Sequence, residues 1–551
     1  IAKIILAINY FNIMEFYGRQ DLLELLNKRA DALSGGYRQN LAIIGTELMG
    51  KTSLLKYWLS KYCDNRIVTV YIEIRQEEVS SFGERFIGNL LLSFLKNSHS
   101  ALKDDIIFLL EKCEKYIPKT TASARKILFE RYARRTEGLF TKLLELVELF
   151  SGESGKYCVL IFDEFHLLER ISPKDIYASW RKHIMLNKNT MYVLLSSKQE
   201  LSGKILAKDL ALLFGNFEKI DLPPFDNKTS IGFIRNKLKS LNVSEQILSF
   251  IVNLSSGKPF YLNAICDALM NYHLKSARAA ITFDSFINSQ EGIFIGEWGI
   301  LNSRFSSLIQ QIDSVFKDTA VFSVITALAS GLNILSDVTQ RCGKSKKYVS
   351  RVLNKLYEED FISKNADVYT LNDVLFALWL RCAYVKKTGV FNTEPEKEKE
   401  LFKNEMGAIF ADFRDAQTKE ISQRLMELFG NFNNELIEVH KKRLRLNLFK
   451  EIKLLDLGAK QLNKGIVARS ASAVWITGFK EDRAKEEDLL EFADFCKRFK
   501  YGKTQSQKRI FIALNEIDAN ASLIAKEEKI STWDTALVNS LFDIYGKPRI
   551  V

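Results

Sequence analysis

The sequence has no apolar run long enough to cross a membrane, and its cysteines follow no metal-binding pattern. A membrane helix needs about 20 predominantly apolar residues, and no stretch of this 551-residue chain approaches that length. The apolar start, residues 1–16, has one positive charge, Lys3, and no small-residue cleavage site, so we expect no signal peptide. The seven cysteines are scattered without a C-x-x-C motif or a histidine pairing. This usage excludes an evident metal site and predicts a cytoplasmic protein with no membrane partner.

Strong charge of one sign is also absent. The net charge of +12 is modest for this length, so it permits a nucleic-acid or acidic partner without requiring one. An apolar fraction of 47% is ordinary for a globular chain that buries sizeable cores. The length predicts about three domains.

Residues 45–52 form a complete G-x-x-x-x-G-K-[ST] phosphate loop, between the apolar segment 41–44 and a segment with helical spacing. Glycines let the backbone N–H groups turn toward phosphates at the start of the following helix. Lys51 can reach the β- and γ-phosphates, and the Thr52 hydroxyl can ligate Mg²⁺. A chance glycine turn is the alternative, which the strand–loop–helix context disfavours. We predict nucleotide contacts by Gly45, Thr46, Glu47, Leu48, Met49, Gly50, Lys51, Thr52 and Ser53.

A second polar group follows the apolar run 157–162, which ends in Asp163-Glu164. A carboxylate at the end of a parallel strand can hold the Mg²⁺ of a nucleotide, a role we assign to Asp163. Glu164 is then placed to orient or deprotonate the attacking water. Alone, such a strand end is an ordinary entry into a polar loop, but the upstream phosphate loop favours the catalytic interpretation. A third strand, 191–195, precedes Ser197, which we predict to sense the γ-phosphate; an ordinary turn is the alternative.

Four stretches of residues 14–270 resemble the archaeal-type ATPases of the STAND class, relatives of AAA+ proteins. They are the phosphate loop, the Asp163-Glu164 strand, an opening like F-x-G-R-x-x-E-L at residues 16–22, and a G-x-P lid signature at residues 257–259. The resemblance implies that Gly18 and Arg19 lie beside the adenine and that Pro259 packs near the base. One departure is Asn216, where the family often has arginine. Arg181 is a candidate substitute, with a solvated surface residue as the alternative.

Residues 316–371 predict a winged helix-turn-helix. Helices are expected over residues 316–330, 334–340 and 345–356, and hairpin strands over 361–363 and 368–371. The third helix should expose cations and hydroxyls suited to a DNA groove: Lys344, Lys346, Lys347, Tyr348, Ser350, Arg351 and Lys355. Of these we assign DNA contact to Lys344, Lys346, Lys347, Tyr348 and Arg351. The alternative is a structural arm with solvated lysines.

The last part, from about residue 400, resembles the restriction-endonuclease-like tail found beside such ATPases. We expect strands at 473–480, 509–514 and 530–534, with a helix at 487–499. An active nuclease needs two carboxylates for Mg²⁺ beside a lysine. Gly478 stands where the second carboxylate belongs, which leaves Lys480 alone, and nothing local confirms Asp456 as the first. An inactive scaffold is therefore expected, with the basic run 441–445 serving phosphate or partner contact, or solvation alone.

The sequence predicts an α/β protein with a P-loop NTPase parallel sheet of AAA+/STAND type. Its parts are an ATPase core (1–225), a helical lid (226–300), a winged helix-turn-helix (301–390) and the endonuclease-like tail (391–551). The predicted function is a slow ATPase that binds ATP/ADP and Mg²⁺ and switches the binding of double-stranded DNA or a protein; homo-oligomerisation is left open. The alternatives are a DNA-binding regulator or scaffold with structural ATP, and an ATP-gated nuclease in defence against foreign DNA.

Overall fold

The computed structural model describes most of the chain: residues 16–75, 77–96, 105–132, 138–171, 176–211, 217–276, 281–384, 395–439, 442–458, 464–502 and 505–551. Contacts between residues divide the chain into two compact units. The first unit ends at Thr229, close to the predicted end of the ATPase core, and also includes Lys258–Phe260 and Glu358–Asp360; the second unit contains the remaining residues. The division into four domains stays a prediction. None of the described helices is long and apolar enough to cross a membrane.

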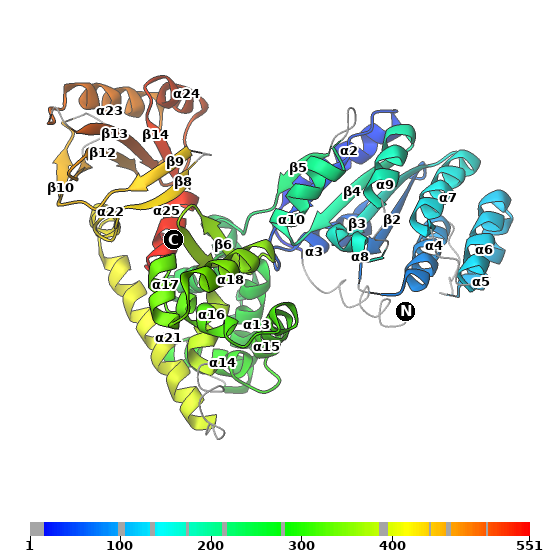
Figure 1. Ribbon diagram of the computed structural model, residues 1–551, viewed down its shortest axis with the longest axis horizontal. Helices are drawn as coiled ribbons and strands as arrows, with labels where there is room; N and C mark the ends of the chain where they lie inside the picture. Colours follow the sequence, from blue (N-terminus) through cyan, green and yellow to red (C-terminus); the bar gives the residue numbers. More distant parts are fainter. Residues whose placement is uncertain are drawn as a thin grey trace. The chain divides into compact units, whose positions relative to one another are not determined.

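The first unit contains a five-stranded sheet in the order β2-β3-β4-β1-β5 (Figure 1). Every pairing in it is parallel, which confirms the predicted parallel sheet. The strands are β1 (Leu41–Ile44), β2 (Ile67–Glu73), β3 (Tyr157–Asp163), β4 (Thr190–Ser196) and β5 (Glu218–Asp221). Their carboxyl ends meet at one edge of the sheet, which is where ligands bind in parallel α/β folds.

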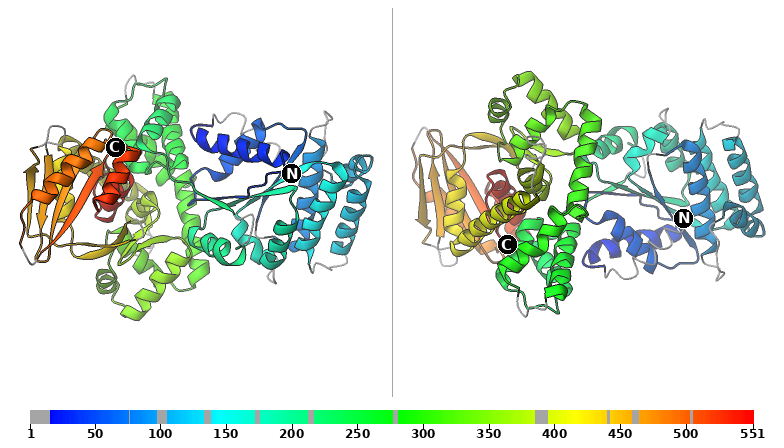
Figure 2. Two further views of the ribbon diagram at one scale, coloured as in Figure 1. Left: turned by 90° about the horizontal axis from the view of Figure 1, so that it is seen from above. Right: turned by 90° about the horizontal axis from the view of Figure 1, so that it is seen from below.

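Helices cover both faces of this sheet. Successive side chains of each strand point to opposite faces, so the buried strands contribute apolar side chains to a core on each side. In β1, Leu41 and Ile43 pack in the core beneath α2 and α3. Ala42 and Ile44 pack in the opposite core, beneath α4 to α9. Figure 2 shows the sheet between α2, in dark blue, and the teal helices α9 and α10. The bounds are α2 (Gln20–Ser34), α3 (Lys51–Lys61), α4 (Val79–Leu95), α5 (Ile106–Glu114), α6 (Pro118–Tyr132), α7 (Leu139–Ser154), η1 (Phe165–Leu167), α8 (Leu168–Ile171), α9 (Ile176–Leu186), α10 (Gln199–Lys204) and the π-helical turn η2 (Ile205–Asp209).

The second unit begins with helices that follow the sheet in the chain. They are α11 (Asn227–Lys237) and α13 (Pro259–Ser276), whose first residues belong to the first unit, together with α12 (Glu245–Ser255), α14 (Phe283–Phe294) and α15 (Ile300–Phe316). Thr282 starts α14 with a capping box that satisfies backbone N–H groups at the helix end. The long helix α21 (Pro395–Thr418) packs on α12 and α14. The Phe283 and Phe410 rings stack there, with centroids 3.7 Å apart.

A helix–helix–helix–hairpin segment follows near the predicted positions, except that its first helix begins at Val321 rather than at 316, because α15 ends at Phe316. Its elements are α16 (Val321–Ala329), α17 (Leu335–Cys342), α18 (Lys346–Glu358), β6 (Ile362–Asn365) and β7 (Val368–Leu371), with α19 (Val374–Trp379) and η3 (Leu380–Tyr384) after it. Val349, Val352 and Leu353 are buried on one side of α18. With this spacing of apolar residues, the polar residues of α18 lie on the opposite side of the helix.

The tail contains a mixed sheet in the order β10-β11-β12-β13-β14. β11 is antiparallel to β10 and β12, while β12, β13 and β14 run parallel. The predicted strands at 473–480, 509–514 and 530–534 are present as β12, β13 and β14. The bounds are α22 (Ile421–Gly430), β8 (Glu435–Val439), β9 (Lys442–Leu446), β10 (Glu451–Asp456), β11 (Lys464–Arg469), β12 (Ala473–Lys480), α23 (Glu486–Arg498), β13 (Ser506–Ala513), α24 (Ala519–Glu527), β14 (Ser531–Asp534) and α25 (Thr535–Ile544).

Candidate functional site

The phosphate loop follows β1 directly and leads into α3, as the motif predicts. A Cβ atom on Gly45 would lie 2.8 Å from the backbone oxygen of Leu222, so only glycine fits there. Gly50 has a φ of 84° and caps the start of α3, a conformation that side chains other than glycine rarely adopt. The loop backbone is thereby held at the positive end of a helix, where anions bind.

Lys51 lies inside this loop. Its side chain is nearly buried, and its Nζ donates to the carbonyl oxygens of Gly45 at 2.7 Å and Thr46 at 3.0 Å. Burial lowers the pKa of Lys51, while Glu164 and Asp163 oppose that shift. The amine is therefore placed where the loop would surround phosphates.

Asp163, at the end of β3, connects the loop to the sheet. Its Oδ2 accepts hydrogen bonds from the Thr52 hydroxyl and the Tyr71 hydroxyl, each at 2.6 Å. Its Oδ1 is buried and has no hydrogen-bond partner among the residues that the structure describes. A buried carboxylate oxygen left without a partner is costly unless a cation binds it. The donor set of a hydroxyl and a free carboxylate oxygen fits Mg²⁺, which prefers hard oxygen ligands.

Glu164 lies in a polar network at the carboxyl edge of the sheet. Its φ is 58°, in the left-handed region, and its Oε2 accepts hydrogen bonds from the Ser197 backbone N–H at 2.9 Å and the Ser197 hydroxyl at 2.8 Å. The His166 Nδ1 is 3.4 Å from the same oxygen and 2.8 Å from the Ser196 hydroxyl. Burial raises the pKa of Glu164 and lowers the pKa of His166 to about 3, so this imidazole is neutral at neutral pH.

One contact of this network is not part of the sequence expectation. The Ser197 hydroxyl donates to Glu164, and its contact with the γ-phosphate stays a prediction. Sequence reasoning also missed Tyr71 and His166. His166 follows the acidic pair by two residues and is one of five histidines in the chain, which is a usable signal. No sequence signal marks Tyr71, because its position is that of an ordinary aromatic residue in a buried strand.

The predicted adenine contacts lie on a different segment. Gly18 and Arg19 both adopt left-handed backbone conformations. The Arg19 guanidinium donates to the Pro223 carbonyl oxygen and lies 4.9 Å from the centre of the Phe225 ring. Its Nε is buried without a hydrogen-bond partner among the described residues. The structure thus brings the opening motif beside residues after β5, with Phe225 as a ring that sequence reasoning missed.

The predicted lid signature forms a tight helix-to-helix turn. Ser256 and Gly257 have φ values of 54° and 70°, and Pro259 begins α13, the position at which proline costs no hydrogen bond. Contacts group Lys258–Phe260 with the first unit. Arg181 lies in α9, which packs against α7. Asn216 lies outside the described residues.

The predicted DNA contacts lie along α18 and just before it. Lys344, Lys346, Lys347 and Arg351 are exposed and make no ion pair with a residue that the structure describes. Tyr348 is half-buried and donates to Asp318 at 2.8 Å. Lys355 differs from expectation, because its Nζ donates to the Val315 carbonyl oxygen at 2.7 Å and lies over the Phe316 ring. The exposed face of α18 is therefore basic, and Lys355 is not among the residues that make it so.

The tail places one carboxylate beside Lys480. Asp488 of α23 is fully buried, and its two oxygens lie 2.7 and 2.6 Å from the Lys480 Nζ. The Lys485 backbone N–H also donates a hydrogen bond to Oδ2 of Asp488, at 2.8 Å. Asp456 is exposed at the end of β10, which β11 separates from β12. No group of three histidine, cysteine or acidic side chains forms a metal site within the described ranges.

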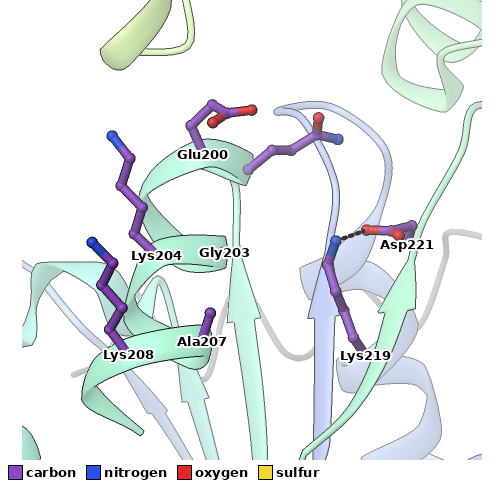
Figure 3. A pocket seen from close by; sticks show the side chains of 8 residues that line it. Glu200, Gly203, Lys204, Ala207, Lys208, Lys219 and Asp221 are labelled. Carbon is purple, nitrogen blue, oxygen red and sulfur yellow. Dashed lines mark ion pairs between the residues drawn. The ribbon is translucent and has the colours of Figure 1, made fainter. Parts of the chain in front are cut away.

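A shallow pocket of ≈ 380 Å³ lies between α10–η2 and β5 (Figure 3). Lys204 and Lys208 project from one side of the helix, and Lys219 forms an ion pair with Asp221 at 2.9 Å. Glu200 also lines the pocket. The mixture of exposed charges of both signs selects no ligand.

No family model matches the chain, and no curated protein matches its sequence. Among solved structures, the Walker-type ATPase of Pyrococcus abyssi is similar, with 17% identity over 66% of this chain and 96% of that chain and a TM-score of 0.44. The ORC2 protein of Aeropyrum pernix, as ADPNP–ADP complexes, has 12% identity over 72% and 96%, with a TM-score of 0.41. The ORC1 protein of that organism, in complex with DNA, has 10% identity over 68% and 95%, with a TM-score of 0.38. At TM-scores below 0.5, these likenesses establish neither a family nor a partner.

The residues of the chain itself give the chemical conclusion. A phosphate loop with its lysine follows one parallel strand, and a hydroxyl–carboxylate pair with a neighbouring glutamate ends another. These are the parts with which P-loop ATPases hold a nucleotide and activate water. The first unit has the active-site framework of a P-loop ATPase.

Proposed function

We propose that this chain is an ATP-hydrolysing molecular switch of the STAND kind, in which nucleotide state controls the binding of double-stranded DNA by α18. The observation that supports the ATPase part most directly is the pairing of Thr52 with Asp163 at 2.6 Å, beside a buried Lys51. In this arrangement the loop, the cation ligands and the general base belong to one site. A homo-oligomer or a protein partner is compatible with the same switch.

Each residue has a distinct task in the proposed reaction. The loop backbone and Lys51 bind the β- and γ-phosphates of ATP. Thr52 and Asp163 would hold Mg²⁺, which neutralises charge on the phosphates when it is bound. Glu164 orients the attacking water and accepts its proton, and its side chain is 27% exposed, so water reaches it. Gly18, Arg19, Phe225 and Pro259 are the candidates for the adenine end.

The Ser197–Glu164 contact supports slow turnover. Both hydrogen bonds from Ser197 end on one oxygen of Glu164, so this oxygen must exchange a partner before it accepts a proton from water. The same contact favours the second candidate function, a DNA-binding regulator in which ATP is structural. Turnover of the purified chain, measured with and without duplex DNA, separates the two: a switch hydrolyses ATP at a rate that DNA changes, and a regulator shows no such change.

DNA binding is assigned to α18 rather than to the hairpin tip. Asn365 at the end of β6 exchanges hydrogen bonds with the backbone of Glu438 in β8. The Asp367 backbone N–H donates to the Leu436 carbonyl oxygen at 3.2 Å. Because β8 occupies the tip in this way, a winged helix built from these elements would present its third helix, and not its wing, to a duplex.

The test of DNA binding compares two triple variants of equal charge. Lys346→Ala, Lys347→Ala and Arg351→Ala together should weaken duplex binding and reduce the salt slope by about one per lost phosphate contact. The control changes three exposed tail lysines to alanine, Lys500, Lys526 and Lys547, and should retain both affinity and slope. Affinity that survives the α18 variant at every salt concentration would move the interface elsewhere, with Arg443 and Arg445 tested next. A parent chain without DNA affinity would favour a protein partner.

The nucleotide site has its own test. Lys51→Ala should abolish ATP binding measured by calorimetry, since it removes the side-chain cation that the loop supplies. Lys61→Ala, at the exposed end of the same helix, is the control and should bind as the parent does. Equal ATP affinity in the Lys51 variant and the parent would refute the proposed site.

A further inference from the structure

We propose that Tyr71 is a positioning residue of the cation site, because its hydroxyl holds Asp163 with one carboxylate oxygen available to Mg²⁺. This inference rests on the proposed ATPase function and extends the site to β2. The phosphate-loop motif and the acidic pair do not include this strand.

The hydrogen bonds of Asp163 are distributed unequally over its two oxygens. The Tyr71 and Thr52 hydroxyls both donate to Oδ2, each at 2.6 Å. Oδ1 is buried with no hydrogen bond from the described part of the chain. A carboxylate can rotate and exchange its oxygens, and two donors on the same oxygen oppose this rotation. The pair of hydroxyls therefore keeps Oδ1 free in advance, which reduces the reorganisation that a cation must cause.

The sheet register explains why Tyr71 reaches this carboxylate. β2 and β3 are parallel neighbours in which Tyr71 lies opposite Ile161 and Glu73 opposite Asp163. Residues two apart on a strand share a face, so Tyr71 and Asp163 point to the same side. The Asn89 side chain donates to the Tyr71 carbonyl oxygen at 3.0 Å, and the Ile74 backbone N–H donates to the Asp163 carbonyl oxygen at 2.8 Å.

The Tyr71 ring is held in place, since it packs in the core with α3 and the Lys56 Nζ lies 5.7 Å from its centre. Phenylalanine can keep the packing of the ring while removing the donor.

The experiment measures cation affinity separately from nucleotide affinity. Binding of ADP to the full chain is measured in EDTA and across a Mg²⁺ series, and Mn²⁺ occupancy is followed by electron paramagnetic resonance in the presence of ADP. For Tyr71→Phe we expect unchanged affinity for ADP in EDTA. The Mg²⁺ and Mn²⁺ concentrations for half-saturation should rise about tenfold, the scale of one lost hydrogen bond to a charged group.

Two variants define the range of outcomes. Tyr62→Phe removes a hydroxyl that donates to Asp31 at 3.1 Å, at an exposed site of the same unit, and should leave both quantities unchanged. Asp163→Asn removes the ligand charge and should weaken the cation more than Tyr71→Phe does. Unchanged half-saturation in Tyr71→Phe would overturn the proposal, as would an equal loss of ADP affinity with and without Mg²⁺, which indicates a structural role. A parent chain that binds no nucleotide would refute the proposed function itself, and this inference with it.

Discussion

Replacement of Glu164 by glutamine tests the assignment of the general base. Glutamine keeps an acceptor oxygen for the Ser197 N–H and hydroxyl, which in the parent lie 2.9 and 2.8 Å from the carboxylate. The fold and the nucleotide affinity should therefore be retained. An amide cannot accept the proton of the attacking water, so turnover should fall by about 10²-fold or more, the scale of a lost general base. That factor corresponds to about 2.7 kcal/mol in the activation barrier.

The assay is steady-state phosphate release at saturating Mg-ATP, with affinity measured in parallel. Glu169→Gln, on the exposed side of α8, serves as the matched control and should turn over like the parent. Unchanged turnover in Glu164→Gln would refute the role of Glu164. Equal losses of affinity and turnover would indicate structural damage instead.

The pH dependence provides a second check on the same residue. Burial raises the pKa of Glu164, so parent turnover should fall with acidification at a midpoint above the ordinary glutamate pKa of ~4.3. The contribution of Glu164 to the free energy of unfolding depends on pH in the opposite direction. It is fully present below the unfolded pKa and is lost as pH rises through the folded pKa, because the buried protonated form is favoured in the folded state. A turnover profile with no acidic limb in this range would contradict the assignment.

Three further predictions concern other residues. Ser197→Ala removes one of two hydrogen bonds to Glu164, which should move the acidic limb of the turnover profile to higher pH; an identical profile would show that this hydroxyl does not act on Glu164. Lys480→Ala should destabilise the tail by about 3 kcal/mol, because it leaves the fully buried Asp488 carboxylate without its ion-pair partner; hydrogen exchange of β12 and α23 measures the loss, and Lys464→Ala, which breaks the more exposed ion pair with Glu420, is the comparison. The purified chain should not nick plasmid DNA with Mg²⁺ or Mn²⁺, since both oxygens of Asp488, the carboxylate that contacts Lys480, already accept hydrogen bonds; nicking that Lys480→Ala stops would contradict this.

Several features were determined by the sequence alone, because each depends on residues close together in the chain. The phosphate loop needs Gly45 and Gly50 at fixed spacing between a strand and a helix, and the structure has both elements where the motif predicts them. Apolar periodicity likewise predicted the parallel sheet and the strand that ends at Asp163. Such signals are local, so they survive without knowledge of tertiary contacts.

Only the tertiary structure decided which side chains meet across strands. Tyr71 lies 92 positions before Asp163 and contacts it only because β2 and β3 are neighbours in register. Ser197 likewise reaches Glu164 from the end of the adjacent strand β4, a contact that the sequence does not predict. In the tail, Lys480 was expected to stand alone, but α23 brings the buried Asp488 to it. Each of these contacts depends on strand order and helix placement, which the residues near it in the chain do not encode.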